Sequence, residues 1–476
     1  MTRRTITPDI CVIGAGSGGL SVAAAATAFG VDVVLIEKGL MGGDCLNHGC
    51  VPSKSLIAAA AGAASTRAAA AFGAECSDPR FDYSRTHAHI RDVIAAIAPH
   101  DSEERFEGLG VTVLRDHARF VDERTVEAGD IRVRARRFVV ATGSSAAVPP
   151  IPGLDSVAYL TNETIFDLTS RPDRLLIVGG GPIGIELAQA YRRLGAEVAV
   201  VDAAQALSRE DREAAAAVLE TLRSEGVRLY ENAKITRVEP DGDGIAVVME
   251  TAEGEGRLSG SHLLVAVGRT PNVAGLDLEA AGIEHDRWGI RVDGSMRTSN
   301  RRVYAIGDVA GGLQFTHAAN YHAGLVVRAI LFRLPVRNKP ILVPRVTFTD
   351  PELAHVGMSE EEARGRHGDS ISVLRASFAE NDRARAEDRT EGFVKLVTDR
   401  RGRILGVTIV GAGVGELISL WSLAVSRRLK VSAIAGLVLP YPTLSETGKR
   451  AAVAFYSAIP QKPWVRRLVR FLRIFG

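Results

Sequence analysis

The pattern that most constrains the fold of this chain is a βαβ unit at residues 9–37. Residues 9–13 form a short apolar run typical of a buried parallel strand, a helix is expected through Phe29, and residues 31–36 predict a second strand. Glycines permit a tight turn between strand and helix and the close approach of a pyrophosphate, whose charge the helix N-terminus stabilises. Glu37 ends the second strand, where a carboxylate can accept hydrogen bonds from ribose hydroxyls. The turn carries the three glycines of a G-x-G-x-x-G pattern, Gly14, Gly16 and Gly19.

A second copy of this unit occupies residues 175–202. An apolar run at residues 175–178 leads into another glycine-rich turn, a helix to about Leu194 and a strand at residues 196–201 that ends at Asp202. A decayed second copy is the alternative interpretation, but both copies keep their glycines and their acid. The chain is therefore predicted to bind two dinucleotides. The glycines of the second turn are Gly179, Gly181 and Gly184.

Asp202 indicates which nicotinamide cofactor the second unit binds. A carboxylate at this position hydrogen-bonds a ribose 2′-hydroxyl and repels a 2′-phosphate. Residues 203–205 supply no cation, and the nearest one, Arg209, lies seven positions further on. NADH is therefore expected rather than NADPH.

Two cysteines, Cys45 and Cys50, lie in the segment 42–54 and are half of the cysteines in the chain. Within one ideal helix their Cα atoms would lie about 8–9 Å apart, beyond the roughly 7 Å that a disulfide allows. Cys45 is therefore expected in an extended or distorted lead-in, and Cys50 near a helix start that favours a thiolate. A purely structural disulfide is the alternative, but so few cysteines favour a redox-active pair. Cys11, in a core strand, and Cys76, in a loop, are expected to be inert.

The composition is that of an ordinary globular protein. At 476 residues the chain is long enough for about three domains, and 46% of its residues are apolar and 24% charged. The formal net charge of +2 gives no strong field for nucleic acid, so no nucleic-acid partner is expected. Cleavage of a leader at residues 23–28 would destroy the first glycine pattern, and no convincing membrane span is expected. The few cysteines fit a cytoplasmic location.

The cysteine segment and four further motifs resemble the class I pyridine nucleotide–disulfide oxidoreductases. This flavoenzyme family includes dihydrolipoamide dehydrogenase, glutathione reductase and mercuric reductase. The resemblance runs from about residue 9 to about residue 457, and its further motifs are residues 138–144, 265–272, 303–308 and 348–352. It implies an α/β fold with two Rossmann-like dinucleotide-binding domains and a C-terminal α+β dimerisation domain. The implied parts are an FAD-binding domain at 1–148 and 271–343, an NAD(P)-binding domain at 149–270, a dimerisation domain at 344–460 and a tail at 461–476.

The resemblance also implies roles for individual residues. It assigns FAD to the first βαβ unit and the nicotinamide cofactor to the second. Cys50 is the thiol against the flavin, and Cys45 is the outer, interchange thiol that meets the acceptor. Lys54 and Glu186 match an ion pair beside the flavin N5, where a cation favours the reduced, anionic flavin. Asp308 matches the residue that bonds the ribityl chain, and no resident metal is expected. Further cofactor contacts are implied at Lys38, Gly43, Thr142, Gly143, Gly268 and Ala318.

The chain departs from the family pattern near its C-terminus. Most disulfide reductases of the family carry His-Pro-Thr followed by a glutamate, and this His–Glu pair serves the interchange thiol across the dimer. Here Tyr441 replaces the histidine, while Glu446 remains. Tyrosine, with a free pKa near 10, is a poor proton shuttle at pH 7 compared with histidine near 6.5. Efficient turnover of dihydrolipoamide or glutathione disulfide is therefore not expected.

A tyrosine in this neighbourhood resembles the mercuric-reductase branch. Those enzymes carry a C-terminal cysteine pair, whereas this chain has no cysteine after Cys76. The chain therefore resembles a mercuric-reductase-like branch that lacks the pair. His48, between the two redox cysteines, is a candidate local base or ligand, with simple packing as the alternative.

Two functions are consistent with the sequence. The first is a homodimeric enzyme that passes electrons from NADH through FAD and Cys45–Cys50 to an unidentified acceptor, which is a disulfide, a metal ion or a quinone. The second is a flavin-bound redox sensor or electron-transfer partner with little turnover. Residues 464–475 predict an amphipathic helix with arginines on one face. Such a tail can bind weakly to an anionic surface at the inner face of a membrane, or pack on the dimer.

Overall fold

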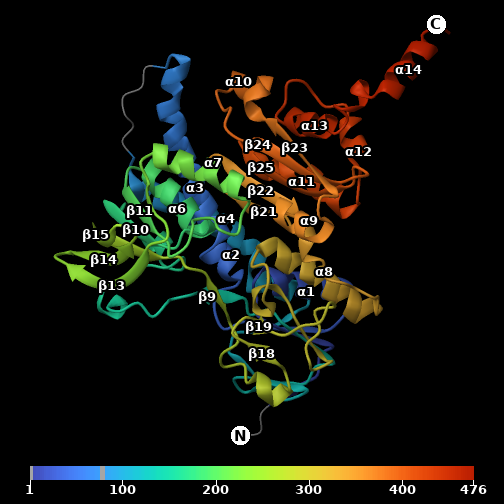
Figure 1. The fold of residues 1–476 in the computed structure, drawn as a ribbon. Helices are drawn as coiled ribbons and strands as arrows, with labels where there is room; N and C mark the ends of the chain where they lie inside the picture. The colour runs from blue at the N-terminus through green and yellow to red at the C-terminus, as the bar shows by residue number, and fades with distance from the viewer. Residues whose placement is uncertain (1–3, 75–80, 476) are drawn as a thin grey trace. The chain divides into compact units, whose positions relative to one another are not determined.

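The computed structural model describes residues 4–74 and 81–475. The chain divides into two compact units, Met1–Ala204 with Val227–Asn338, and Gln205–Gly226 with Lys339–Gly476 (Figure 1). The predicted α/β fold is confirmed, because two parallel sheets lie in the first unit and a sheet with helices forms the second. The predicted NAD(P)-binding segment contributes residues to both units, and the predicted domain boundaries stay predictions.

The first unit is built around a parallel sheet that contains the first glycine pattern. Its strand order is β20-β8-β2-β3-β4, with every neighbouring pair parallel. Helices α1 (Ser17–Ala28) and α8 (Thr316–Phe332) pack together, and their apolar side chains form a buried core with the sheet. The strands are mostly apolar, as a sheet covered on both faces requires. They are β2 (Ile10–Ile13), β3 (Val33–Ile36), β4 (Thr112–Leu114), β8 (Arg137–Val140) and β20 (Val303–Ala305).

A second, four-stranded sheet of order β1-β7-β6-β5 covers the other face of this parallel sheet. Side chains of the two sheets share one buried core, in which Phe120 and Phe138 meet edge to face with ring centroids 5.5 Å apart. Cys11 lies in this core with no exposed surface, as predicted. The strands of the second sheet are β1 (Arg4–Ile6), β5 (Ala118–Asp122), β6 (Thr125–Ala128) and β7 (Ile131–Val133).

The second glycine pattern lies in the parallel sheet β12-β11-β10-β16, and helix α6 (Pro182–Arg193) follows its turn. In both βαβ units the predicted strand and helix bounds agree with the structure to within two residues. An antiparallel sheet of three strands shares a core with the second pattern. The strands are β10 (Arg174–Val178), β11 (Glu197–Val201), β12 (Arg228–Tyr230), β13 (Lys234–Asp241), β14 (Gly244–Thr251), β15 (Gly254–Gly260) and β16 (His262–Val265). Two short strand pairs complete the unit, β9 (Ser144–Ala146) with β17 (Arg269–Pro271), and β18 (His285–Asp286) with β19 (Gly289–Ile290).

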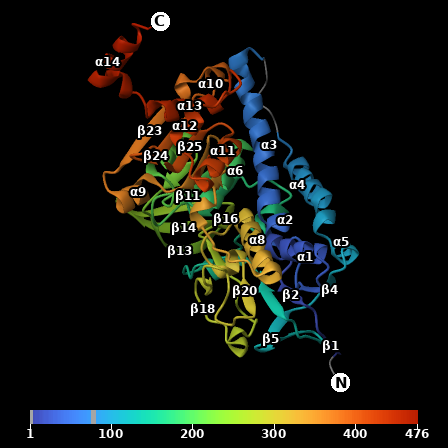
Figure 2. The same cartoon turned by 90° about the vertical axis from the view of Figure 1, so that its right-hand side faces the viewer.

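The long helix α3 (Cys50–Ala68) follows the short helix α2 (Gly43–Asn47). It packs beside α4 (Tyr83–Ile97), as Figure 2 shows, and also contacts α6. Contrary to the expectation from the sequence, one segment, Gly43–Phe72, is long and apolar enough to cross a membrane by length and composition. The same segment carries both redox cysteines and packs on helices of its own unit. Helix α5 (Glu103–Gly108) precedes β4.

The second unit is an antiparallel sheet, β21-β22-β25-β24-β23, with helices on both faces. Alternate residues of its strands point to one side, where they form a core with helices α11 (Val414–Ser426) and α13 (Ser445–Ala454). On the other side Lys395 bonds Asp211, the residue that caps helix α7 (Arg212–Ser224), at 2.8 Å. The remaining elements are β21 (Arg345–Thr347), β22 (Glu352–Gly357), β23 (Ile371–Ser377), β24 (Phe393–Asp399), β25 (Ile404–Gly411), α9 (Glu360–His367), α10 (Asp382–Ala386), α12 (Val431–Ala435) and α14 (Pro463–Leu472).

Candidate active site

The two glycine patterns form the same local geometry. Gly14 has a φ of +102°, and a Cβ there would lie 2.4 Å from the carbonyl oxygen of Ala141. Gly179 has a φ of +110° and meets the oxygen of Ala266 at the same 2.4 Å. No side chain fits at either position, because the turn brings the first strand's end against the neighbouring strand's end. The same constraint recurs at the third glycines, where a Cβ on Gly19 would lie 1.9 Å from the oxygen of Gly14 and one on Gly184 would lie 2.0 Å from that of Gly179.

The middle glycines are different, because little of the protein itself occupies the space of a side chain. A Cβ on Gly16 would meet only the Cα of Gly43, at 4.0 Å, and one on Gly181 would meet nothing within 4 Å. At both positions the backbone at the N-terminus of a helix is therefore accessible to a bound group. This open cradle fits the pyrophosphate of a dinucleotide.

The acid at the end of each second strand is held against its own glycine turn. Glu37 accepts hydrogen bonds from the backbone N–H groups of Ala15 and Gly39, both at 2.6 Å. Asp202 accepts from Gly180 at 2.6 Å and from Ala204 at 2.7 Å. Both carboxylates are therefore fixed beside the turn, where the predicted bonds to ribose hydroxyls would form.

Cys45 and Cys50 lie on different helices and are both free thiols. Cys45 belongs to α2, so it is helical rather than extended, and the predicted distortion is a break at His48 and Gly49 before α3 begins at Cys50. The start of α2 contacts the first glycine pattern, because the N–H of Gly42 donates to the oxygen of Ala15 at 2.9 Å. The cysteine pair is thus anchored beside the cradle for the first dinucleotide.

In the reduced pair the two thiols differ in pKa, because a hydrogen bond joins them. A hydrogen bond from Cys45 lowers the pKa of Cys50 to about 6, and Thr316 and the charge of Lys54 act in the same direction against the effect of burial. The same hydrogen bond, followed by burial and the charge of Cys50, raises the pKa of Cys45 well above its usual range. The hydroxyl of Thr316, the first residue of α8, lies 3.4 Å from the Cys50 sulfur. Cys50 is therefore the thiolate of the reduced pair, and Cys45 is its protonated donor.

Alkylation by iodoacetamide is expected to reveal this asymmetry. In the reduced enzyme, the rate of Cys50 alkylation should rise between pH 5 and pH 7, because the thiolate forms above a pKa of about 6. Substitution Cys45→Ala removes the hydrogen-bond donor and should move this midpoint upward. Mass-spectrometric mapping of the labelled cysteine at each pH measures both effects. A midpoint near 8.5 in the unsubstituted protein would contradict the proton-sharing arrangement.

Lys54 and Glu186 form the ion pair that the resemblance implied. Lys54 Nζ lies 2.8 Å from Glu186 Oε2, across the contact between α3 and α6. The Glu186 side chain is only 7% exposed, whereas that of Lys54 is 37% exposed. Since Lys54 follows Cys50 by four residues on one helix, its ammonium also lies on the thiolate side of the helix. The pair therefore couples the two dinucleotide-binding parts at the cysteine helix.

A polar network that the sequence did not reveal ties α2 to the strands beside it. Arg269 is 10% exposed and lies 3.1 Å from the carboxylate of Asp44, the residue before Cys45. Its guanidinium also donates to the hydroxyl and to the carbonyl oxygen of Ser144, each at 2.7 Å. Ser144 in turn donates to Asp308 at 2.5 Å. The nearest sequence signal was the match of residues 265–272 to the family, which did not identify the partners of Arg269.

The other predicted cofactor residues lie close to this network. Thr142 and Gly143 form the turn after β8, where Thr142 donates to the carbonyl oxygen of Asn272 at 2.8 Å. Gly268 precedes β17 with a φ of +134°. Gly43 has a φ of +60°, and a Cβ there would lie 2.8 Å from the Cα of Gly16. Lys38 is exposed, whereas Ala318 is buried in the first turn of α8.

Tyr441 is 70% exposed, and its hydroxyl donates a 2.7 Å hydrogen bond to Asp382. That bond and the charge of Asp382 raise the pKa of Tyr441, so the phenol is even less able to lose its proton at neutral pH than a free tyrosine. Glu446 lies in the first turn of α13, where it accepts a long hydrogen bond from the backbone N–H of Thr443 at 3.5 Å. The geometry of this segment is that of a fixed hydrogen-bond donor rather than a proton shuttle.

Three other expectations concern His48, Cys76 and a resident metal. The carbonyl oxygen of His48 accepts from Asn162 at 3.3 Å, and its imidazole role as base or ligand stays a hypothesis. Cys76 lies outside the described residues. Within residues 4–74 and 81–475, no group of three or more His, Cys, Asp or Glu side chains could hold a metal ion.

The site combines two dinucleotide cradles with a cysteine pair, and the Lys54–Glu186 ion pair joins the cysteine helix to the helix of the second cradle. This arrangement is that of a flavoprotein disulfide reductase. The model of the pyridine nucleotide-disulphide oxidoreductase family matches residues 8–323, and the model of its dimerisation domain matches residues 343–452. The chain belongs to this family, and the class I resemblance inferred from the sequence is confirmed. It is an FAD-containing, NAD(P)H-dependent oxidoreductase that forms a homodimer.

Named relatives support the assignment over nearly the whole chain. A mercuric reductase of Bacillus cereus is 34% identical over 450 residues, which cover 94% of this chain and 71% of that protein. A dihydrolipoyl dehydrogenase of Chlorobaculum tepidum is 34% identical over 455 residues, which cover 93% of this chain and 96% of that protein. The Cu(II) complex of the HOCl-induced flavoprotein disulfide reductase RclA from Escherichia coli superposes with a TM-score of 0.82 at 29% identity, covering 92% of this chain and 98% of that one.

Proposed function

We propose that this enzyme passes two electrons from NADH through FAD to the Cys45–Cys50 disulfide, and that the resulting dithiol reduces a thiol-binding metal ion. A metal ion is favoured as the acceptor because Cys45 stays protonated and the phenol of Tyr441, which is hydrogen-bonded to Asp382, is no base that could deprotonate it. A metal ion needs no base for this step, because coordination to a metal deprotonates a thiol outright.

The residues of the chain divide the work as follows. Bound FAD supplies the chemistry that converts hydride transfer from NADH into reduction of a disulfide. Lys54 holds a positive charge beside Cys50, and Glu186 keeps that ammonium charged in a partly buried site. Reduction breaks the S–S bond and leaves Cys50 as the thiolate and Cys45 as the thiol.

Return of the pair to the disulfide balances the cycle. The S–S bond forms again, the remaining thiol proton is released, and two electrons go to the acceptor, as in the reduction of two Cu(II) ions to Cu(I) or of one Hg(II) ion to the metal. A disulfide acceptor would instead require Cys45 to attack as a thiolate, and its raised pKa opposes that step at pH 7. The names of two relatives, a mercuric reductase and a Cu(II) complex of RclA, agree with a metal acceptor.

An anaerobic acceptor screen tests the proposal. NADH oxidation by the holoenzyme is measured with Cu(II), Hg(II), lipoamide, glutathione disulfide and a soluble quinone, each corrected for the reaction without enzyme. We expect a metal ion to exceed every disulfide by at least about 10²-fold. Efficient turnover of a disulfide would contradict the acceptor assignment. Absence of turnover with every acceptor would instead favour the flavin-bound redox sensor.

Asp202 leads us to propose NADH as the physiological donor. Its two oxygens are already bound to backbone N–H groups, so the carboxylate has no freedom to turn away from a 2′-phosphate. We expect kcat/KM to be at least about tenfold higher with NADH than with NADPH, since a like-charge contact is costly in a binding site. Steady-state kinetics with both donors and one acceptor provide the comparison. Equal values would show that Asp202 does not face the ribose.

We also propose that the enzyme is cytoplasmic, and that α14 binds anionic lipid and holds it at the inner face of a membrane. Figures 1 and 2 show α14 extending from the second unit, and none of its side chains is buried. Trp464, Phe471 and Leu472 are each more than half exposed on a helix that also carries arginines. Each arginine near an anionic surface contributes about 1 kcal/mol of binding free energy.

In vesicle co-sedimentation, the full-length protein is expected to bind more strongly than a variant that ends before Pro463. The full-length dimer should pellet with phosphatidylglycerol vesicles at low salt, with less in the pellet as salt screens the arginines. Phosphatidylcholine vesicles serve as the control for charge. Equal pelleting of both proteins would indicate that α14 packs on the partner subunit instead.

A further inference from the structure

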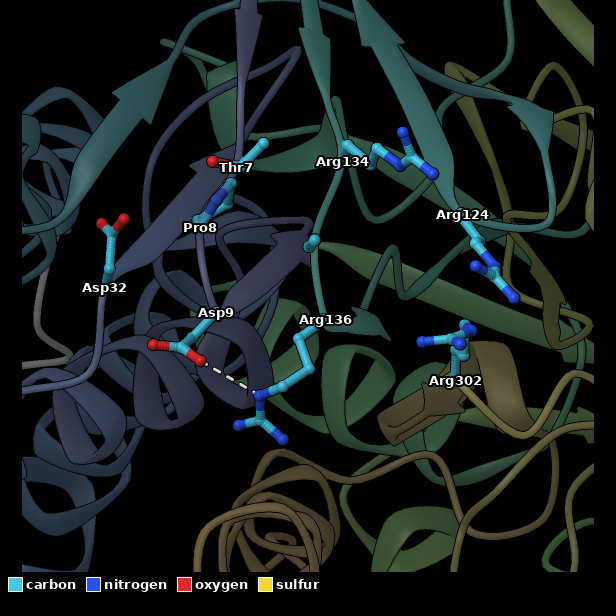
Figure 3. Close-up of a pocket in the computed structure, with 9 residues that line it drawn as sticks. Thr7, Pro8, Asp9, Asp32, Arg124, Arg134, Arg136 and Arg302 are labelled. Atoms are coloured by element: carbon cyan, nitrogen blue, oxygen red, sulfur yellow. Dashed lines mark hydrogen bonds and ion pairs between the residues drawn. The ribbon is translucent and has the colours of Figure 1, made fainter.

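A hollow lined by arginines lies at one edge of the first parallel sheet (Figure 3). Its volume is about 510 Å³, within the range of small-ligand sites. The charged side chains around it come from two sheets and their connections. They are Asp9, Asp32, Arg124, Arg134, Arg136 and Arg302.

Sheet topology places this hollow at the edge opposite the first glycine turn. Strands β2, β3, β8 and β20 are parallel, so their first residues gather at one edge and their last residues at the other. Asp9 directly precedes β2, Arg136 precedes β8, and Arg302 precedes β20. The glycine turn that fits a pyrophosphate follows the other end of β2. A ligand in the hollow is therefore separate from the first dinucleotide cradle, and none of the residues that line the hollow belongs to the second one.

The hollow carries positive charge that the protein leaves largely unpaired. Four arginines face two aspartates, and one ion pair is formed, between Arg136 Nε and Asp9 Oδ1 at 3.0 Å. Within the described part of the chain, the guanidinium groups of Arg124, Arg134 and Arg302 have no ion-pair or hydrogen-bond partner. Folding has thus gathered like charges without neutralising them, which costs free energy unless a ligand supplies the counter-charge.

The neighbouring residue Arg137, the first of β8, experiences this field. Burial lowers its pKa, and the charges of Arg136, Arg302 and Arg297 lower it further. The guanidinium of Arg137 donates to the carbonyl oxygen of Arg136 at 2.9 Å, and it adds a further positive charge beside the hollow. The positive charge of the hollow therefore also acts on Arg137, at the start of β8.

The chemistry of the lining selects the ligand class. Guanidinium groups bind phosphate oxygens through paired N–H donors, and several of them match an anion with several phosphoryl groups. None of the residues that line the hollow within the described chain is aromatic, so a nucleobase would find no stacking surface. We propose that this hollow binds a compact anion with two or more linked phosphoryl groups, such as inorganic tripolyphosphate.

Isothermal titration calorimetry of the holoenzyme with tripolyphosphate tests this site. Saturating NAD⁺ is present throughout, so that the nicotinamide cradle does not bind the titrant. Arg134→Gln and Arg302→Gln are each expected to raise the Kd about tenfold or more, because each removes charged donors from the anion. Arg134→Lys keeps the charge but loses the planar guanidinium, so its Kd should lie between those of the unsubstituted protein and Arg134→Gln. Arg400→Gln, an exposed arginine in the second unit, is the matched control and should bind as the unsubstituted protein does.

Further titrants identify the source of the phosphoryl groups. ATP should bind no more tightly than tripolyphosphate, because its base gains no contact, and orthophosphate should bind much more weakly than either. Flavin absorbance of each variant confirms that it is folded and loaded. Absence of tripolyphosphate binding, or binding that both glutamine variants retain, would overturn the proposal. Arginine-dependent binding to phosphatidylglycerol vesicles without binding of free tripolyphosphate would assign the hollow to a lipid surface and equally overturn it.

Discussion

The substitution Tyr441→His is expected to raise turnover of small disulfides by about 10²–10⁴-fold, the usual contribution of a general acid–base group. A histidine at this position would titrate near pH 6.5, where tyrosine does not, and could take the proton that Cys45 holds in the reduced pair. Glu446 already lies in the first turn of the next helix, where the family pattern places the carboxylate that orients the imidazole. Steady-state NADH oxidation with lipoamide and with glutathione disulfide measures the gain.

Tyr441→Phe is the matched control for this experiment. It removes the hydrogen bond to Asp382 without adding a base, so disulfide turnover should stay as low as in the unsubstituted enzyme. The histidine variant should also show a rise in kcat/KM with pH around the imidazole pKa. If it binds FAD normally and gains no disulfide activity, the lack of a base at residue 441 does not limit this enzyme.

The substitutions Cys45→Ser and Cys50→Ser are each expected to lower NADH-dependent metal reduction by at least about 10³-fold, because neither variant can form the redox disulfide. The two variants should differ in absorption. Cys45→Ser retains the thiolate at Cys50 and should show a long-wavelength band with bound flavin, whereas Cys50→Ser should lack it. Anaerobic spectra at pH 7.5 and stopped-flow turnover measure these effects.

Cys11→Ser serves as the control for thiol content, since Cys11 is fully buried in the core and lies on no proposed electron path. Burial raises its pKa above the usual range of a thiol, so Cys11 forms little thiolate at neutral pH. Metal reduction that survives in both the Cys45 and Cys50 variants would show that the flavin passes electrons to the acceptor directly.

Local patterns in the sequence were sufficient for the parts of the fold that depend on neighbouring residues. Both βαβ units follow from apolar runs and glycine spacing, and the third glycines Gly19 and Gly184 meet the same kind of backbone oxygen, 1.9 Å and 2.0 Å away. Helix α3 begins at Cys50, in agreement with the predicted helix start near this residue. The short helix around Cys45 was missed, because five residues carry too little periodicity to distinguish a helical turn from an extended lead-in.

The sequence by itself determined the two βαβ units with their glycine turns, because glycine conformation and apolar periodicity are local properties. The resemblance of its motifs to a known family added the class of fold and the expected roles of Cys45 and Cys50. Only the tertiary structure decided which groups set the protonation of those cysteines, and Thr316 at 3.4 Å from Cys50 had no sequence signal. The same holds for Arg269 with Asp44, and for the arginines that gather at the sheet edge. Their electrostatic effect depends on distances between residues far apart in the chain, and folding alone sets those distances.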